Sequence, residues 1–243
     1  MNNVMPELLK SKKDQSNMIA ALDIGTSKVV VIVAELQADG VLKIIGKGQH
    51  VSKGLKKGVV INIEHTMQAI QRAVEEAELM ADCKITEVYT GIAGSHIKSL
   101  NSHGMVKIKD EEVTQMDIDR VRETAEAITL PTDQEVLHTL DQEYIVDDQQ
   151  DIKEPLEMSG MKLNVKVHII SGSIAARMNI IKCIKRCGLD VTHLVFQPLA
   201  SSAAVLTEDE KELGVCLVDI GGGTTDIAVI KNGAFQHTAV IPV

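Results

Sequence analysis

Aromatic residues are nearly missing from this 243-residue chain, which contains no tryptophan and only 2% aromatic residues in all. The hydrophobic core must therefore consist of Ile, Val, Leu, Ala and Met, as in α/β proteins with buried parallel strands. The hydrophobic content of 44% and the charged content of 24% are typical of a globular chain rather than a disordered one. Length and composition together predict an α/β protein with one large domain or two ordinary ones.

Long hydrophobic runs are missing as well. The most apolar stretch, residues 18–36, is interrupted by Asp23 and Lys28. We therefore expect neither a membrane-spanning helix nor a signal peptide, and the pattern favours a cytoplasmic protein.

Positive charge is scarce, with 25 Lys and Arg against 34 Asp and Glu and a net charge of −9. This balance argues against nucleic acid as a partner, because phosphate backbones attract basic surfaces. Residues 1–16 are polar and carry a small basic group, Lys10, Lys12 and Lys13. We interpret this segment as a solvated, disordered tail, because so few charges attract a membrane only weakly.

Cysteine is limited to Cys83, Cys183, Cys187 and Cys216. Cys183 and Cys187 lie four residues apart in a predicted helix and therefore share a face. A metal site needs more ligands, and no histidine lies at a suitable spacing. The four side chains are expected to be reduced and mostly buried thiols.

The two commonest nucleotide-binding motifs are also missing. No G-x-x-x-x-G-K-[ST] segment is present, and a Rossmann turn would open a helix. Instead the chain has two glycine turns, residues 23–28 (DIGTSK) and 219–226 (DIGGGTTD). Apolar runs precede and follow each turn, at 19–22 and 29–33 and at 215–218 and 227–230. Each segment is therefore expected to form a β-hairpin whose tip carries an aspartate, backbone N–H groups and hydroxyls.

These two tips have the chemistry of a phosphate site. Glycine lacks a Cβ atom, so a phosphate can approach the backbone closely, and successive N–H groups form an anion-binding nest. Asp23 and Asp219 suit a hard cation such as Mg²⁺ between carboxylate and phosphate oxygens. The predicted phosphate-binding residues are Gly25, Thr26, Ser27, Lys28, Gly221, Gly222, Gly223, Thr224 and Thr225.

The two turns also form an internal repeat, because residues 22–26 match residues 218–222 in sequence and in flanking pattern. A duplicated unit implies two related lobes with a ligand between them. Only a short segment follows the second turn, so we expect the second lobe to be truncated and the chain to be a fragment.

Between the turns, alternating and helical patterns predict further elements. A strand is expected at 41–50, a loop at 54–58, a helix at 64–81 and a strand at 87–92. The helix has an apolar face made of Ile70, Ala73, Val74, Ala77 and Met80.

An acidic middle region then differs in character. Short strands are expected at 95–100 and 104–108, and residues 114–117 predict a capping box for a helix running to about residue 128, with Ile118, Val121, Ala125 and Ile128 on its apolar face. Pro131 is expected to stop this helix. Two strands joined by a polar connection at 147–154 follow.

The core is expected to resume with a strand at 165–171. Ser173 is predicted to cap a helix that ends at Gly188, followed by a buried strand at 191–196. Pro198 is predicted to open a helix through residue 206, and residues 208–212 form a charged turn.

Taken together, these residues resemble the actin and heat-shock-chaperone ATPase superfamily. Within it, the chain is similar to the FtsA family of bacterial division proteins over nearly all of residues 17–243. Besides both glycine turns, the likeness lies in residues 88–97 (VYTGIAGSHI), 101–104 (NSHG), 130–133 (LPTD) and 158–161 (MSGM).

The resemblance implies a ribonuclease-H-like, actin-type core with an inserted α+β module. The implied divisions are a disordered tail at 1–16, a discontinuous first core lobe at 17–87 and 165–212, an interaction module at 88–164, and the start of a second core lobe at 213–243. It also implies that Asp23 and Asp219 organise Mg²⁺ while the two turns hold the β- and γ-phosphates of ATP. Gln197 matches the position that orients the attacking water, although a helix-end residue bonding backbone is an equal alternative.

The implied function is an ATP-binding cell division scaffold that forms filaments under the membrane, anchors FtsZ and recruits later division proteins through the module. The family's adenine-binding glycines and its C-terminal membrane helix have no counterpart in these residues. Two alternatives stay open. One is a small-molecule kinase or phosphoanhydride phosphatase of the same superfamily, and the other is a nucleotide-independent interaction module.

Overall fold

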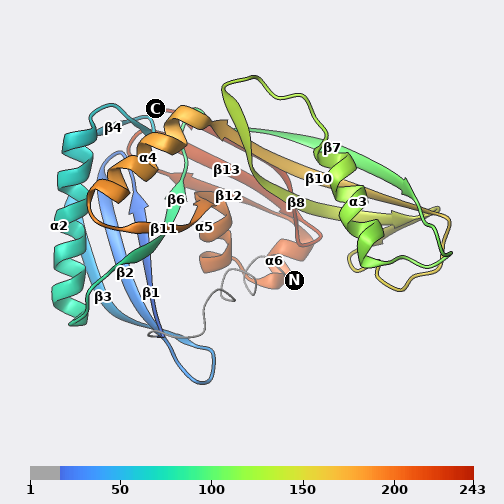
Figure 1. Ribbon diagram of the computed structural model, residues 1–243, viewed down its shortest axis with the longest axis horizontal. Helices are drawn as coiled ribbons and strands as arrows, with labels where there is room; N and C mark the ends of the chain where they lie inside the picture. The colour runs from blue at the N-terminus through green and yellow to red at the C-terminus, as the bar shows by residue number, and fades with distance from the viewer. Residues whose placement is uncertain (1–16) are drawn as a thin grey trace.

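The computed structural model describes residues 17–243, which form three main sheets and their covering helices (Figure 1). The predicted disordered tail, residues 1–16, lies outside the described residues. The helices are α2 (Ile63–Ala81), α3 (Gln115–Glu126), α4 (Ile174–Arg186), α5 (Gln197–Val205) and α6 (Glu208–Leu213). None of the helices in the described part of the chain is long and apolar enough to cross a membrane.

The first sheet has five strands in the order β11-β6-β1-β2-β3. β1 and β2 form an antiparallel hairpin, and β6 runs parallel to both β1 and β11. The β1–β2 hairpin confirms the strands predicted on either side of the first glycine turn. The strands are β1 (Met18–Ile24), β2 (Lys28–Leu36), β3 (Leu42–Val51), β6 (Glu87–Ile92) and β11 (Asp190–Phe196).

Helices α2 and α4 pack together over one face of this sheet (Figure 1). The Asn62 side chain accepts a hydrogen bond from the His65 N–H at the start of α2, and Asp82 ends the helix in the left-handed region. Of the predicted apolar face, Met80 is the exception, with 67% of it exposed. The last turn of α2 lies along β3, which is the sheet edge, where the Met80 sulfur accepts the Lys47 N–H at 3.4 Å.

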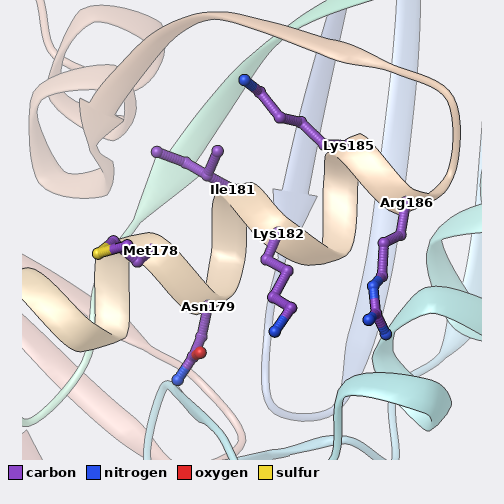
Figure 2. Close-up of a pocket in the computed structure, with 6 residues that line it drawn as sticks. All are labelled: Met178, Asn179, Ile181, Lys182, Lys185 and Arg186. Atoms are coloured by element: carbon purple, nitrogen blue, oxygen red, sulfur yellow. The ribbon is translucent and has the colours of Figure 1, made fainter.

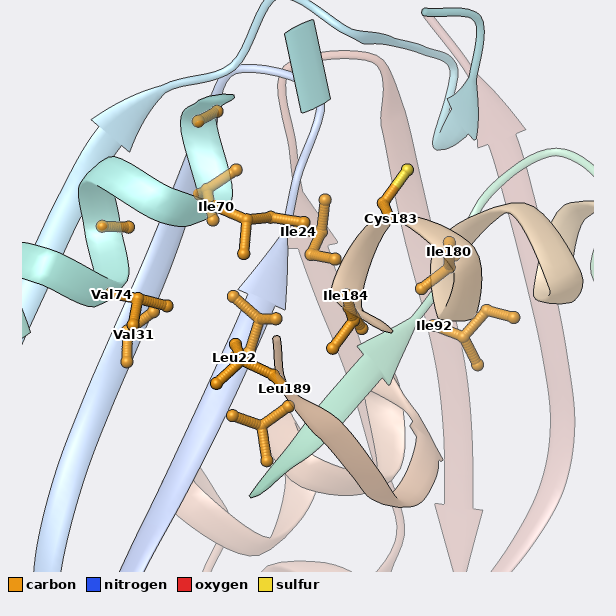
Figure 3. Packing of buried hydrophobic residues seen from close by; sticks show 14 of the residues in the cluster. Leu22, Ile24, Val31, Ile70, Val74, Ile92, Ile180, Cys183, Ile184 and Leu189 are labelled. Atoms are coloured by element: carbon orange, nitrogen blue, oxygen red, sulfur yellow. The ribbon is translucent and has the colours of Figure 1, made fainter. Parts of the chain in front are cut away.

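The buried side chains of this layer are aliphatic, as the lack of aromatics predicts (Figure 3). Figure 3 shows Leu22 and Ile24 of β1 meeting Ile70 of α2 and Ile184 of α4. All four cysteines are free thiols; Cys183 is buried and Cys83 and Cys187 are partly buried. Cys216 is exposed, so the prediction of mostly buried thiols was wrong for this residue.

The loop predicted at 54–58 contains a very short hairpin, β4 (Leu55–Lys56) with β5 (Val59–Val60). Gly58 lies in its turn with φ +74°, a conformation that glycine adopts without strain. The hairpin lies next to the first glycine turn, where the Gly58 N–H reaches Thr26.

The second sheet has the strand order β7-β10-β8-β9, with α3 packed against β7 and β10. In Figure 1 it extends away from the first sheet. A capping box between Thr114 and Asp117 opens α3, as predicted. The helix ends at Glu126, before the predicted stop at Pro131. The strands are β7 (Lys98–Lys107), β8 (Gln134–Val146), β9 (Gln149–Ile152) and β10 (Lys162–Ser173).

Two expectations for this region were wrong. The short strands predicted at 95–100 and 104–108 are one continuous strand, β7. Gly104 lies inside this strand without interrupting it. A Cβ atom at this position would lie 2.2 Å from the Val121 carbonyl oxygen of α3. This glycine gives α3 room to approach. The polar connection at 147–154 is also partly a strand, β9.

Sheet membership also differs from the predicted boundaries. β10 pairs with β7 and β8 along its whole length, so the strand expected at 165–171 belongs to the second sheet and not to the core sheet. Conversely, β6 lies between β1 and β11 in the first sheet. The division of the chain into lobes stays a prediction.

The third sheet contains β12 (Val215–Ile220), β13 (Thr224–Lys231) and β14 (Ala234–Pro242), and each strand is antiparallel to its neighbour. The charged turn predicted at 208–212 is the short helix α6, because Thr207 and Glu210 form a capping box. β14 packs against β7 and β8, so the third sheet is docked on the second one.

Candidate functional site

The first glycine turn closes the β1–β2 hairpin. In this hairpin Asp23 lies opposite Val30 and Ile24 lies opposite Val29. The Gly25 N–H donates to the Lys28 carbonyl at 2.9 Å, and a Cβ atom on Gly25 would lie 3.0 Å from that oxygen. The turn is therefore tight, as expected.

The second glycine turn has the same construction. Asp219 lies directly opposite Asp226 in the β12–β13 hairpin, and the Gly221 N–H donates to the Thr224 carbonyl at 2.8 Å. A Cβ atom on Gly221 would lie 3.0 Å from that carbonyl oxygen, as at Gly25. The internal repeat seen in the sequence is thus a repeat of turn geometry.

The two turns meet at their tips. A Cβ atom on Gly222 would lie 2.8 Å from the Ser27 Cβ, and one on Gly223 would lie 2.8 Å from the Thr26 hydroxyl oxygen. Glycine is needed at both positions because a side chain would separate the turns. Segments from opposite ends of the chain therefore present their backbone and hydroxyl groups at one place.

Helix α5 connects the two aspartates. Gln197, its first residue, donates from Nε2 to Asp23 Oδ1. One turn later, the Ser201 hydroxyl donates to Asp219 Oδ2 at 3.1 Å. Sequence reasoning missed Ser201, although its four-residue spacing from Gln197 places both on one helix face.

The hydroxyls predicted to bind phosphate differ in their surroundings. Thr26 Oγ1 accepts the Gly58 N–H at 3.1 Å, which attaches the β4–β5 hairpin to the first turn. The Thr224 hydroxyl donates to Asp226 Oδ2 at 3.1 Å and is buried. Ser27 and Lys28 are exposed, while Thr225 is half-buried. Ser27 and Lys28 are therefore the first-turn groups most open to a ligand.

The carboxylates of the site are crowded. Although part of Asp23 is exposed, the surrounding protein desolvates the carboxylate and raises its pKa; Asp219 raises it further and Lys28 opposes the shift. Asp226 is 6% exposed, and burial raises its pKa to about 6, with Asp219 adding to the shift and the Thr224 hydroxyl opposing it. The site therefore concentrates negative charge that a cation would relieve.

Asp226 was not among the predicted site residues. Its Oδ1 atom is buried without a hydrogen-bond partner in the described part of the chain. An unpaired buried carboxylate oxygen costs free energy unless something binds it. The signal in the sequence was its position as the last residue of the second turn motif.

No group of three or more His, Cys, Asp or Glu side chains among residues 17–243 is arranged to hold a metal ion. A cation bound between Asp23 and Asp219 would therefore complete its ligands with water and phosphate oxygens, as Mg²⁺ commonly does. The donor set, all carboxylate and hydroxyl oxygens, fits such a hard cation.

A separate shallow hollow lies on the outer face of α4 (Figure 2). None of the residues around it belongs to either glycine turn. They are Met178, Asn179, Ile181, Lys182, Lys185 and Arg186.

Comparison with known sequences identifies the middle region and the relatives of the chain. Residues 94–171 match the family described as the SHS2 domain inserted in FtsA. The cell division protein FtsA of Pseudomonas aeruginosa is 59% identical over 226 residues, covering 93% of this chain and 54% of the relative. The FtsA of Escherichia coli K12 is 48% identical over 231 residues, covering 95% of this chain and 55% of the relative.

The chain belongs to the FtsA family. It spans about half the length of the curated FtsA proteins that it matches. The predicted family resemblance is thus confirmed.

Solved structures agree on the fold. The PilM-PilN type IV pilus biogenesis complex superposes with a TM-score of 0.65 at 17% identity, covering 92% of this chain and 61% of that one. The ethanolamine utilization protein EutJ from Carboxydothermus hydrogenoformans gives 0.52 at 15% identity, covering 99% and 56%. At such identities the likeness concerns the fold alone. The FtsA-family chain has the predicted α/β, actin-type core with an inserted module.

Proposed function

We propose that this FtsA-family protein is an actin-like cell division scaffold that binds Mg·ATP between its two glycine turns. One observation carries the proposal. The tips of the two turns touch, and α5 joins the aspartates behind them through Gln197 and Ser201. Two N–H-rich turns side by side can hold adjacent phosphates, and the aspartates supply the charge for the cation.

Each predicted residue has a role in this proposal. Gly25, Thr26, Ser27 and Lys28 bind phosphate from the first turn, and Lys28 adds the positive charge. The second turn contributes its backbone and the Thr225 hydroxyl in the same way; its residues are Gly221, Gly222, Gly223, Thr224 and Thr225.

The carboxylates have a different task. Asp23 and Asp219 organise Mg²⁺ through water, and the cation would neutralise phosphate charge. Asp226 supports them, because it lies opposite Asp219 in the hairpin and adds its charge to the same site. In this proposal Gln197 orients a water at the terminal phosphate, which is the positioning that phosphoryl transfer requires.

The division role rests on relatives that are named cell division protein FtsA. We propose that the protein assembles with itself, binds FtsZ, contacts other division proteins through the module at 88–164, and works at the cytoplasmic face of the membrane. Co-sedimentation of the full-length protein with FtsZ, and separately with lipid vesicles, with and without Mg·ATP, tests these partners. Absence of assembly under every condition would contradict the scaffold role.

Isothermal titration of the full-length protein with Mg·ATP tests the site directly. We expect Asp219→Ala to weaken binding about tenfold, because a charged hydrogen-bond acceptor is worth more than 1 kcal/mol. Circular dichroism should show that the variant stays folded. Asp148→Ala, which removes an exposed aspartate beside β9, is the matched control and should bind like the wild type. Equal affinity of Asp219→Ala and the control would contradict the metal role.

A further inference from the structure

The junction between β11 and α5 decides where Gln197 points. Phe196 is the N-cap residue of α5, and no side chain caps this helix through a hydrogen bond. The Phe196 side chain is buried at 1% exposure, so the residue before Gln197 is firmly anchored.

A histidine from the second sheet anchors the backbone at the same point. The Phe196 N–H donates to His138 Nε2 at 3.0 Å, and His138 lies on β8, opposite Ile170 of β10. Burial lowers the pKa of His138 to about 4, so its ring is neutral near pH 7 and can accept this bond. A side chain of the second sheet thus anchors the residue that precedes the site glutamine.

Gly91 limits Gln197 from the other side. A Cβ atom on Gly91, in β6, would lie 2.8 Å from Gln197 Cγ and 3.1 Å from Nε2. Gly91 does not have a positive φ, so alanine fits its backbone and the glycine is required by space alone. The absence of a side chain at residue 91 therefore leaves space for the Gln197 side chain.

We propose that Gly91 and His138 are positioning residues that together hold Gln197 against Asp23. Their function in nucleotide turnover rests on the role proposed above for Gln197. Because His138 belongs to β8, a shift of the second sheet moves the Phe196 backbone and with it Gln197.

The first measurement needs no nucleotide. In ¹H–¹⁵N spectra of the full-length protein, the Gln197 side-chain amide is assigned by its loss in Gln197→Ala. We expect His138→Leu and Gly91→Ala each to shift this signal toward its position in Asp23→Asn. His138→Gln keeps an acceptor and should restore the wild-type position. His65→Gln, on the exposed surface of α2, should leave it unchanged.

The second measurement is a double-mutant cycle on the single-turnover rate of ATP hydrolysis. Each single variant, His138→Leu or Gly91→Ala, should slow hydrolysis about fivefold, as loss of one hydrogen bond in the transition state does. In the Gln197→Ala background both effects should vanish, because positioning residues act only through their target. A general structural defect would persist in that background.

The two measurements separate the possible failures. An unshifted Gln197 signal in both single variants, or additive losses in the cycle, would overturn the positioning role. Absence of Mg·ATP binding by the wild-type protein would overturn the proposed function, whereas the spectra would still decide whether Gly91 and His138 hold Gln197.

Discussion

The three aspartates near the glycine turns differ in ways that depend on single contacts. Asp219 is exposed and accepts from Ser201, Asp23 accepts from Gln197, and Asp226 keeps one oxygen unpaired. Asp226 lies directly opposite Asp219 in its hairpin, so like charges face one another across the strands. This crowding lowers the stability of the unliganded protein, and under the proposed function a bound cation would relieve it.

The cost of the buried Asp226 can be measured. Its pKa in the folded protein is about 6, above the ordinary value of 3.8. As pH rises from about 4 to about 6, the unfolded chain releases its proton first, so the folded state loses stability across this window. We expect Asp226→Asn to stabilise the nucleotide-free protein by about 2–3 kcal/mol at pH 7.5, from a shift of about two pKa units.

Urea denaturation at several pH values checks this expectation. The advantage of the Asp226→Asn variant should shrink as pH falls toward 4, where the wild-type carboxyl is protonated too. Asp148→Asn serves as the control and should change stability little at any pH. A pH-independent effect of Asp226→Asn would show that charge burial is not its cause.

Among the elements, two glycines determine how closely helices approach sheets. Gly48 of β3 faces α2, where a Cβ atom would lie 1.8 Å from the Ala73 carbonyl oxygen. Gly104 of β7 faces α3 in the same way, at 2.2 Å from the Val121 carbonyl oxygen. Both are small residues inside strands, where the absence of a side chain permits close backbone approach.

Gly104→Ala should therefore loosen the contact between α3 and β7. We expect a loss of about 1–3 kcal/mol in the free energy of unfolding, as in other overpacked cores. The neighbouring exposed residue provides a control, since His103→Ala should change stability by less than about 0.5 kcal/mol. Denaturation curves measure both, and equal stability of the two variants would contradict the packing role of Gly104.

At the scale of the whole molecule, β14 joins the third sheet to the second one. The Ser99 hydroxyl donates to the Thr238 carbonyl at 2.9 Å, and the Gln142 amide donates to the Phe235 carbonyl at 2.8 Å. His168, fully buried in β10, contacts Thr238 Oγ1 at 3.0 Å and Asn101 Oδ1 at 2.6 Å through its two ring nitrogens. These side chains tie the strand next to the second glycine hairpin to the inserted module.

Thr238→Val tests this junction because it removes the hydroxyl and keeps the shape. His168 would then have an unpaired buried nitrogen, at a cost of about 1–3 kcal/mol. Thr238→Ser keeps the hydroxyl and should recover most of the stability. Hydrogen exchange of the β14 amides should speed up in the valine variant and not in the serine variant. Equal exchange in both would contradict the role of this contact.

Local chemistry was enough to predict much of this protein. Glycine turns between apolar strands, the Thr114 capping box and the periodicity of α2 depend on residues close together in the chain, and the structure has all of them. The family resemblance rested on equally local motifs. Local signals failed where a residue is required by a contact with a distant element. Gly104 was interpreted as the start of a short strand, although glycine is needed there because α3 packs closely against β7.

Tertiary structure decided how distant segments meet. The contact between the turn tips, the membership of β10 in the second sheet, the raised pKa of Asp226 and the bond from His138 to Phe196 all join residues from different elements. No sequence pattern within one segment encodes such pairs, since each depends on the packing of elements far apart in the chain. The glycine turns were therefore predictable as hairpins, whereas their assembly into one site required the folded protein.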